Sequence, residues 1–119
     1  MYRLSIYILL VVAACPPRLA LAGNRDIVTH KYNVNGVCEQ CKKRIEDAAY
    51  IKGVKYADWE VDTHLLTIKY DSTKTSDTAV LQSIAKAGHD NELRKATDED
   101  YNKLPSCCKY RSELKKHGT

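Results

Sequence analysis

Residues 34–46, with the sequence VNGVCEQCKKRIE, decide the fold of this chain. Asn35-Gly36 is a turn dipeptide, and it follows a run that is rich in β-branched and aromatic residues. Cys38 and Cys41 come next, at the point where a helical pattern begins. The stretch therefore predicts a strand-to-helix corner that holds two thiols side by side.

The periodicity of apolar residues along the rest of the chain predicts the element order strand, helix, strand, strand, helix, strand. We expect strands at residues 27–34, 54–61, 65–70 and 89–96, the last of them polar and at the sheet edge. The first helix is expected over residues 41–51. The second is capped by Thr75 or Ser76 and ends at Gly88. This order predicts an α+β, ferredoxin-like βαββαβ sandwich, with two helices on one face of a four-stranded antiparallel sheet.

Residues 1–22 have the features of an export signal, with a basic start, an apolar run and small residues before a cleavage site near Ala22. Cleavage there would make the mature protein periplasmic or secreted. Residues 12–15 also resemble a bacterial lipobox, which would anchor the protein in a membrane through a lipid on Cys15. The positions of Pro17, Ala20 and Ala22 favour simple cleavage.

Length and charge restrict the function. A chain of 119 residues predicts one domain, and we expect it over residues 23–97, followed by a C-terminal tail over residues 98–119. The tail is polar enough to be mobile when no metal is bound. The formal net charge is +4 for the full chain and about +2 without residues 1–22, which is mild, and no basic stripe with aromatics is present. Both observations argue against nucleic acid as a partner. The sequence has no Ser/His/Asp set, paired carboxylates or nucleotide loop, so we do not expect an enzyme.

The cysteine spacing favours metal binding over structural disulfides. Cys38 and Cys41 are three positions apart and Cys107 and Cys108 are adjacent, and neither spacing closes a long loop. Thiolates are soft ligands that select Cu(I), Zn(II), Cd(II) or Hg(II). A helix N-terminus and neighbouring cations would lower the thiol pKa values. An exposed two-thiolate site can also accept a ligand from a partner and pass the ion on.

Four landmarks in register resemble the heavy-metal-associated domain family: GVCEQC at 36–41, GV at 53–54, IKYD at 68–71 and IAKAGH at 84–89. The resemblance covers roughly residues 27–96. The family includes copper chaperones, the periplasmic mercury-binding protein and the amino-terminal modules of metal-pumping ATPases. It usually has a packing Met at the position of Gly36, and Tyr or Lys at the position of His89, so the chain departs from the pattern twice.

The residues and the resemblance together predict an exported protein that sequesters or relays a soft metal ion. Cu(I) is preferred, and Hg(II), Zn(II) and Cd(II) also fit. We expect Cys38 and Cys41 to carry the binding. Additional metal-ligand candidates are Cys107, Cys108 and His89. The basic run of Lys42, Lys43 and Arg44 is either a solvated helix face or a docking surface for an acidic partner.

Several alternatives remain open. Cys107 and Cys108 could complete a site of three or four thiolates, bind a second ion, bridge two chains or simply oxidise. The expected partner is a metal-transporting ATPase or membrane transporter, and the chain could be a monomer or a metal-bridged dimer. A thiol–disulfide exchange protein would use the Cys38–Cys41 pair instead. An adaptor of the same fold would bind its partner without metal.

Overall fold

A computed structural model describes residues 26–117 of the chain. The proposed signal peptide, its cleavage site near Ala22 and Cys15 lie outside the described residues. Among the residues that are described, no helix is long and apolar enough to cross a membrane. The elements in chain order are β1 (Ile27–Asn33), α1 (Glu39–Ala49), β2 (Val54–Trp59), β3 (Leu65–Asp71), α2 (Asp77–Lys86), α3 (Asp98–Asn102), the 3-10 turn η1 (Ser106–Cys108) and α4 (Tyr110–His117).

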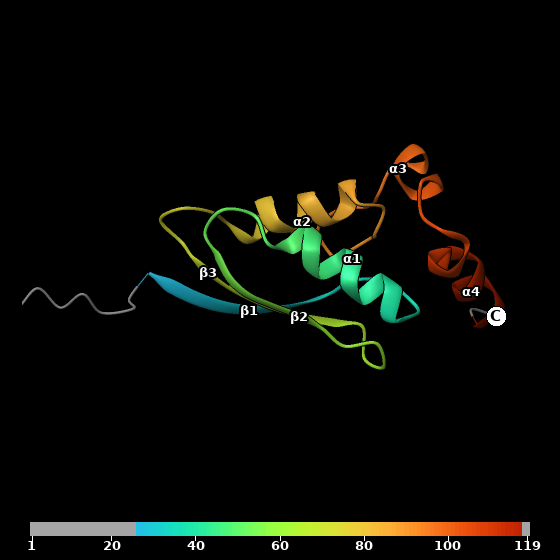
Figure 1. Cartoon of the computed structure of the whole chain (residues 1–119), viewed down its shortest axis with the longest axis horizontal. Helices are drawn as coiled ribbons and strands as arrows, with labels where there is room; N and C mark the ends of the chain where they lie inside the picture. The colour runs from blue at the N-terminus through green and yellow to red at the C-terminus, as the bar shows by residue number, and fades with distance from the viewer. Residues whose placement is uncertain (1–25, 118–119) are drawn as a thin grey trace, which may run out of the picture.

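The three strands form an antiparallel sheet in the order β1-β3-β2, and α1 and α2 lie together on one face of it (Figure 1). The central strand β3 pairs on both sides, with Ile68 opposite His30 of β1 and Ala57 of β2. Leu66, Ile68 and Tyr70 of β3 are buried beneath the helices, as the alternation predicts. The first five predicted elements are therefore confirmed. The predicted and observed ends of each element differ by no more than two residues.

The predicted fourth strand is wrong. Between residues 89 and 96 the structure forms a single antiparallel bridge, Val34 to Asn91, and no strand. Asn91 turns the chain instead, because its side-chain oxygen accepts hydrogen bonds from the N–H groups of Leu93 and Arg94. The Glu92 carboxylate then accepts a hydrogen bond of 2.7 Å from the backbone N–H of Asn33, so a side chain caps the sheet edge.

The helices close the core over the sheet. Ser76 is the N-cap of α2, and its hydroxyl accepts a hydrogen bond of 3.2 Å from the N–H of Ala79, which confirms one of the two predicted caps. Gly88 follows α2 with φ of 105°, a backbone conformation that favours glycine. The helices contribute their apolar faces to the core: Cys41, Ile45 and Ala49 from α1, and Val80, Leu81, Ile84 and Ala85 from α2.

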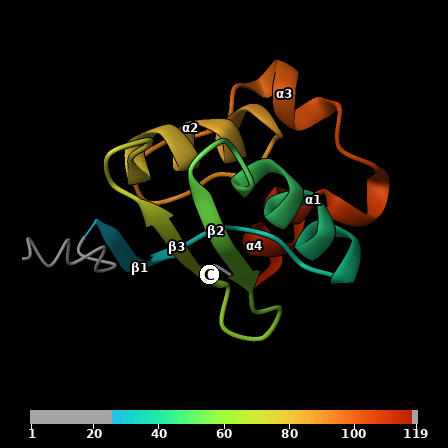
Figure 2. The same cartoon turned by 60° about the vertical axis from the view of Figure 1, so that its left-hand side comes forward.

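The C-terminal segment, residues 98–113, is not the mobile polar tail that the sequence suggested. It forms α3, η1 and the start of α4, and it returns past the end of α1 (Figures 1 and 2). Leu104, Cys108 and Tyr110 are buried in the same apolar cluster as the residues of the sheet and of α1. The segment is therefore packed into the domain, and one of its two cysteines lies in the core.

Candidate metal centre

The two cysteines of the helix corner lie close together. Cys38 is the N-cap residue of α1 with an extended backbone, and its carbonyl accepts the first helical hydrogen bond, 3.0 Å from the N–H of Lys42. Cys41 lies in the first turn and its side chain points into the core, with none of its surface exposed. The two Sγ atoms are 3.5 Å apart and both residues are free thiols. The predicted strand-to-helix corner is present.

A third thiol joins them from the other end of the chain. The Sγ atom of Cys108, in η1, lies 3.9 Å from that of Cys38, although the two residues are 70 positions apart. The Sγ atoms of Cys38, Cys41 and Cys108 all lie within 4.8 Å of one another, and we call these residues the three-thiol cluster. Such a group offers three soft ligand atoms to one ion.

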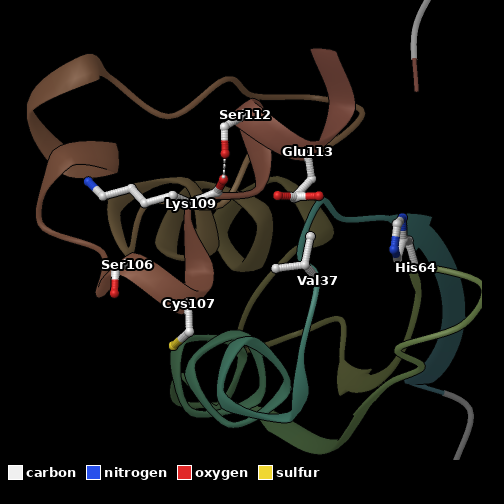
Figure 3. Close-up of a pocket in the computed structure, with 7 residues that line it drawn as sticks. All are labelled: Val37, His64, Ser106, Cys107, Lys109, Ser112 and Glu113. Atoms are coloured by element: carbon white, nitrogen blue, oxygen red, sulfur yellow. Dashed lines mark hydrogen bonds between the residues drawn. The ribbon is translucent and has the colours of Figure 1, made fainter. Parts of the chain in front are cut away.

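Cys107 is oriented differently from its neighbour. It is exposed, its thiol donates a hydrogen bond to the side-chain carbonyl of Gln40, and its Sγ atom lies 3.9 Å from that of Cys108, at the edge of the three-thiol cluster. Its backbone oxygen lies 3.5 Å from the Sγ atom of Cys38. Figure 3 shows Cys107 on one side of an open cavity of about 530 Å³ that Val37 and His64 line on the other side. Cys107 is thus the solvent-facing cysteine of the C-terminal pair.

The three thiols differ in how easily they ionise. Burial opposes ionisation of Cys38, but hydrogen bonds from the backbone N–H groups of Cys41 and Gln40 and from the neighbouring thiols outweigh it and lower its pKa. Burial raises the pKa of Cys41, and burial together with the neighbouring thiols of Cys41, Cys38 and Cys107 raises that of Cys108 strongly. The general lowering expected from the sequence therefore holds for Cys38 only, because the helix corner is buried more deeply than the pattern suggested.

Comparison with known proteins agrees with this geometry. The sequence model of the heavy-metal-associated domain matches residues 31–90, which is half of the chain. The chain belongs to the heavy-metal-associated domain family. Members of this family related to metallochaperones are typically metal-binding proteins without catalytic activity. No curated protein sequence matches the chain.

Solved structures of family members share the fold. The "CopZ metallochaperone" is 29% identical, with a TM-score of 0.52, and the match covers 54% of this chain and 98% of that protein. Oxidised MerP from Ralstonia metallidurans CH34 is 25% identical, with a TM-score of 0.53 over 56% of this chain and 94% of that one. A domain of a potential copper-translocating P-type ATPase from Bacillus subtilis, solved in the Cu(I)-loaded state, is similar in fold at 24% identity and a TM-score of 0.51, over 59% and 90% of the two chains.

The first departure from the family pattern has a structural reason. A Cβ atom at Gly36 would lie 2.9 Å from Cη2 of Trp59 and 3.0 Å from Cβ of Cys41. The fully buried indole of Trp59 thus occupies the space beside Gly36, and its Nε1 donates a hydrogen bond of 2.9 Å to the carbonyl of Val34. The loop of residues 35–37, which precedes Cys38 and which we call the metal loop, therefore packs on a tryptophan.

The second departure, His89, lies outside the three-thiol cluster. It is fully buried, its Nδ1 is 2.8 Å from the carbonyl oxygen of Asn35, and its ring stacks on that of Tyr110 at 5.5 Å between centroids. Its Nε2 atom is buried without a hydrogen-bond partner among the described residues. Burial lowers the pKa of His89. The residue therefore supports the metal loop as a neutral ring, and its role as a ligand stays a prediction.

The basic run is not one uniform surface. The Lys42 ammonium lies 2.6 Å from the Glu46 carboxylate and 2.8 Å from that of Asp58, so its charge is used within the domain. Lys43 is exposed and pairs with Asp47 along the helix at 2.8 Å. Arg44 is half-buried. A docking role for this run stays a prediction, and Lys43 is its most accessible member.

Sequence reasoning missed two residues that position the site, Tyr110 and Arg111. Tyr110 is fully buried, and Arg111 pairs with Asp90 in the loop that follows α2. An aromatic residue two positions after a cysteine pair was a signal that the tail packs against something apolar. No comparable signal marked Arg111, because the C-terminal end carries several basic residues.

Proposed function

We propose that this protein is an exported carrier that sequesters or relays a soft metal ion through Cys38 and Cys41. The single observation that supports it most is the 3.5 Å approach of these two thiols at the N-terminus of α1, within a heavy-metal-associated domain. Thiolate ligands favour soft ions over Mg²⁺ or Ca²⁺. Cu(I) is our first choice, and Hg(II), Zn(II) and Cd(II) fit the same donors.

Cys38 is the thiol at which an ion would first bind. It has the lowered pKa and it is partly exposed, whereas Cys41 lies behind it in the core. A thiolate is the reactive form, so an incoming ion binds Cys38 before it displaces the proton of Cys41. The same order in reverse would release the ion to the thiols of a metal-transporting ATPase or membrane transporter, which is the partner we propose.

A titration tests this proposal. The reduced protein competes anaerobically with a chromogenic chelator for Cu(I), beside the Cys38→Ser/Cys41→Ser double variant. We expect tight binding that the double variant loses, and Ser76→Ala, a change at the far end of α2, should leave it intact. If the unmodified protein failed to compete for all three ions, Cu(I), Hg(II) and Zn(II), the carrier function would be eliminated.

Thiol–disulfide exchange is the second candidate, because the lowered pKa of Cys38 and its closeness to Cys41 also suit a redox pair. A protein of this kind would form a reversible Cys38–Cys41 disulfide with a defined potential, and chelators would not change its activity.

Export rests on residues 1–22 alone. Cell fractionation of the full chain beside Cys15→Ser tests it, since a lipid anchor would require Cys15 and simple cleavage would not.

A further inference from the structure

The C-terminal segment supplies a thiol to the metal loop and is fixed in place by its own contacts. We propose that Cys108 is the third ligand of the metal ion, and that Tyr110 and Arg111 hold it beside Cys38 and Cys41. The proposal rests on the proposed carrier function of the Cys38–Cys41 pair. It makes the site a three-thiolate centre completed within one chain.

The distances between the sulfur atoms fit three ligands better than two. A metal–thiolate bond is about 2.3 Å long, so two thiolates on opposite sides of an ion lie about 4.6 Å apart, and three around it about 4 Å apart. The observed Sγ–Sγ distances are 3.5 Å for Cys38–Cys41 and 3.9 Å for Cys38–Cys108. A linear two-thiolate complex would require Cys38 and Cys41 to separate, whereas a trigonal one requires only small adjustments.

Tyr110 fixes the chain two residues after Cys108. Its hydroxyl donates a hydrogen bond of 2.8 Å to the carbonyl of Gly88 and accepts one of 2.8 Å from the N–H of Asp90. Its ring stacks on His89, so a single side chain contacts three consecutive residues of the loop after α2. Because Tyr110 is fully buried, these contacts have one geometry, and they determine where the backbone that follows Cys108 at the end of η1 lies.

Arg111 adds an ion pair to the same loop. Its guanidinium donates two hydrogen bonds to the Asp90 carboxylate, of 2.9 and 3.1 Å, and a third of 2.8 Å to the carbonyl of Ala96. It also lies over the Tyr101 ring, 4.2 Å from the centroid. Bidentate pairs of this kind specify orientation as well as proximity. We call Tyr110 and Arg111 the C-terminal latch.

The consequence is a site that retains its ion. Each thiol that is still protonated releases its proton to the solvent as its sulfur bonds to the ion, with no change of oxidation state. A partner's thiol cannot simply add to an open position next to two sulfurs. It must displace Cys108, or the latch must open first. The ions this centre selects are those that accept three thiolates, and no second copy of the chain is needed to complete it.

The test uses the reduced protein with Cu(I) as the probe, and compares Cys108→Ala with Cys107→Ser. Removal of a ligand should weaken Cu(I) binding more than about 100-fold, beyond the loss typical of outer contacts. X-ray absorption should count three sulfur neighbours in the unmodified protein and in Cys107→Ser, and two in Cys108→Ala. Equal affinity and sulfur count in Cys108→Ala would overturn the proposal, and so would an equal loss in Cys107→Ser.

Arg111→Ala tests the latch without touching a ligand. Cu(I) should pass to a chelator about 10–100-fold faster from this variant. A change of this size is expected when a contact that positions a ligand is removed. Ser76→Ala is the matched control, since it destabilises α2 away from the latch and should not change transfer. Unchanged transfer in Arg111→Ala would refute the positioning role. If Cys38→Ser/Cys41→Ser also binds Cu(I) normally, the carrier function itself fails, which is a separate result.

Discussion

The contact between Gly36 and Trp59 leads to a sharp prediction about the metal loop. Gly36 is followed closely by Cys38, and the indole of Trp59 lies against it from β2. Replacing Gly36 by Ala would place the new Cβ atom 2.9 Å and 3.0 Å from two carbons of the six-membered ring of that indole. Both partners are held by the core, so the clash has little room to relax.

Two opposing effects set the magnitude. Overpacking of a core site costs about 1–3 kcal/mol, while Gly→Ala reduces the entropy of the unfolded chain and returns about 0.4–1 kcal/mol. The net expectation is a loss of roughly 1–2 kcal/mol in the free energy of unfolding. In a Trp59→Phe background the two clashing carbons are absent and only the 3.0 Å approach to Cβ of Cys41 remains, so most of the cost of Gly36→Ala should disappear there. The coupling between the two substitutions is therefore also about 1–2 kcal/mol.

The four proteins of this double-mutant cycle are the unmodified protein, Gly36→Ala, Trp59→Phe and the double variant. Urea unfolding of all four in the reduced state gives the coupling energy directly. Trp59→Phe alone will be destabilising, because it also removes the hydrogen bond to the carbonyl of Val34, but the cycle cancels that cost. The reasoning would be refuted if Gly36→Ala lowered stability equally in both backgrounds. The clash would then come from the Cys41 side of the loop.

Three further predictions concern the domain around the site. Tyr110→Phe keeps the ring but leaves two backbone groups unsatisfied, and should cost about 2–4 kcal/mol of unfolding free energy, measured in urea. Because burial lowers the pKa of His89, the unfolded chain binds a proton that the folded one does not. The free energy of unfolding should be at its full value above pH 6.5. As the pH falls below 6.5, it should decrease by up to about 1.4 kcal/mol per pH unit, measured as urea midpoints against pH. Ser76→Ala removes the α2 cap and should cost about 1 kcal/mol, measured in the same way.

Each of these has a control within the chain. Tyr56→Phe, on an exposed side chain, should leave the urea midpoint unchanged, and an equal loss there would remove the argument from the buried hydroxyl of Tyr110. His89→Gln should flatten the acid slope below pH 6.5, and an unchanged slope would assign it to another group. Ser76→Thr should preserve most of the stability that Ser76→Ala loses, because threonine can also cap.

The fold could be predicted from sequence wherever periodicity was strong. β3 alternates between buried residues and residues that are half-buried or exposed, and α1 and α2 each bury one face, so their positions followed from pattern alone. The segment after Gly88 failed for a specific reason. Its extended character depended on tertiary pairing, and Asn91 and Glu92 used their side chains to satisfy the backbone instead. Local propensity carries no information about that competition.

Only the part of the site formed by residues close together in the sequence was predictable. Cys38 and Cys41 are three positions apart on one helix corner, so their proximity follows from sequence spacing. Cys108 approaches across 70 residues, and its position depends on buried contacts of Tyr110 with a loop that the sequence assigned to a strand. The pKa of Cys41 could not be predicted for a similar reason. The sequence showed a helix N-terminus but not the burial that opposes it.

The two departures from the family pattern follow a common logic. Each brings an aromatic ring against the metal loop or the loop beside it: Trp59 packs on Gly36, and Tyr110 stacks on His89. At Gly36 the ring fills the space beside a residue without a side chain, and at position 89 it stacks on the ring of the histidine itself. The second ring belongs to the C-terminal segment, which also carries Cys108, so the change at His89 and the third thiol depend on the same docking event. In the proposed three-thiolate centre, the buried ring of His89 is the surface on which Tyr110 packs, and through Tyr110 it would help to position Cys108.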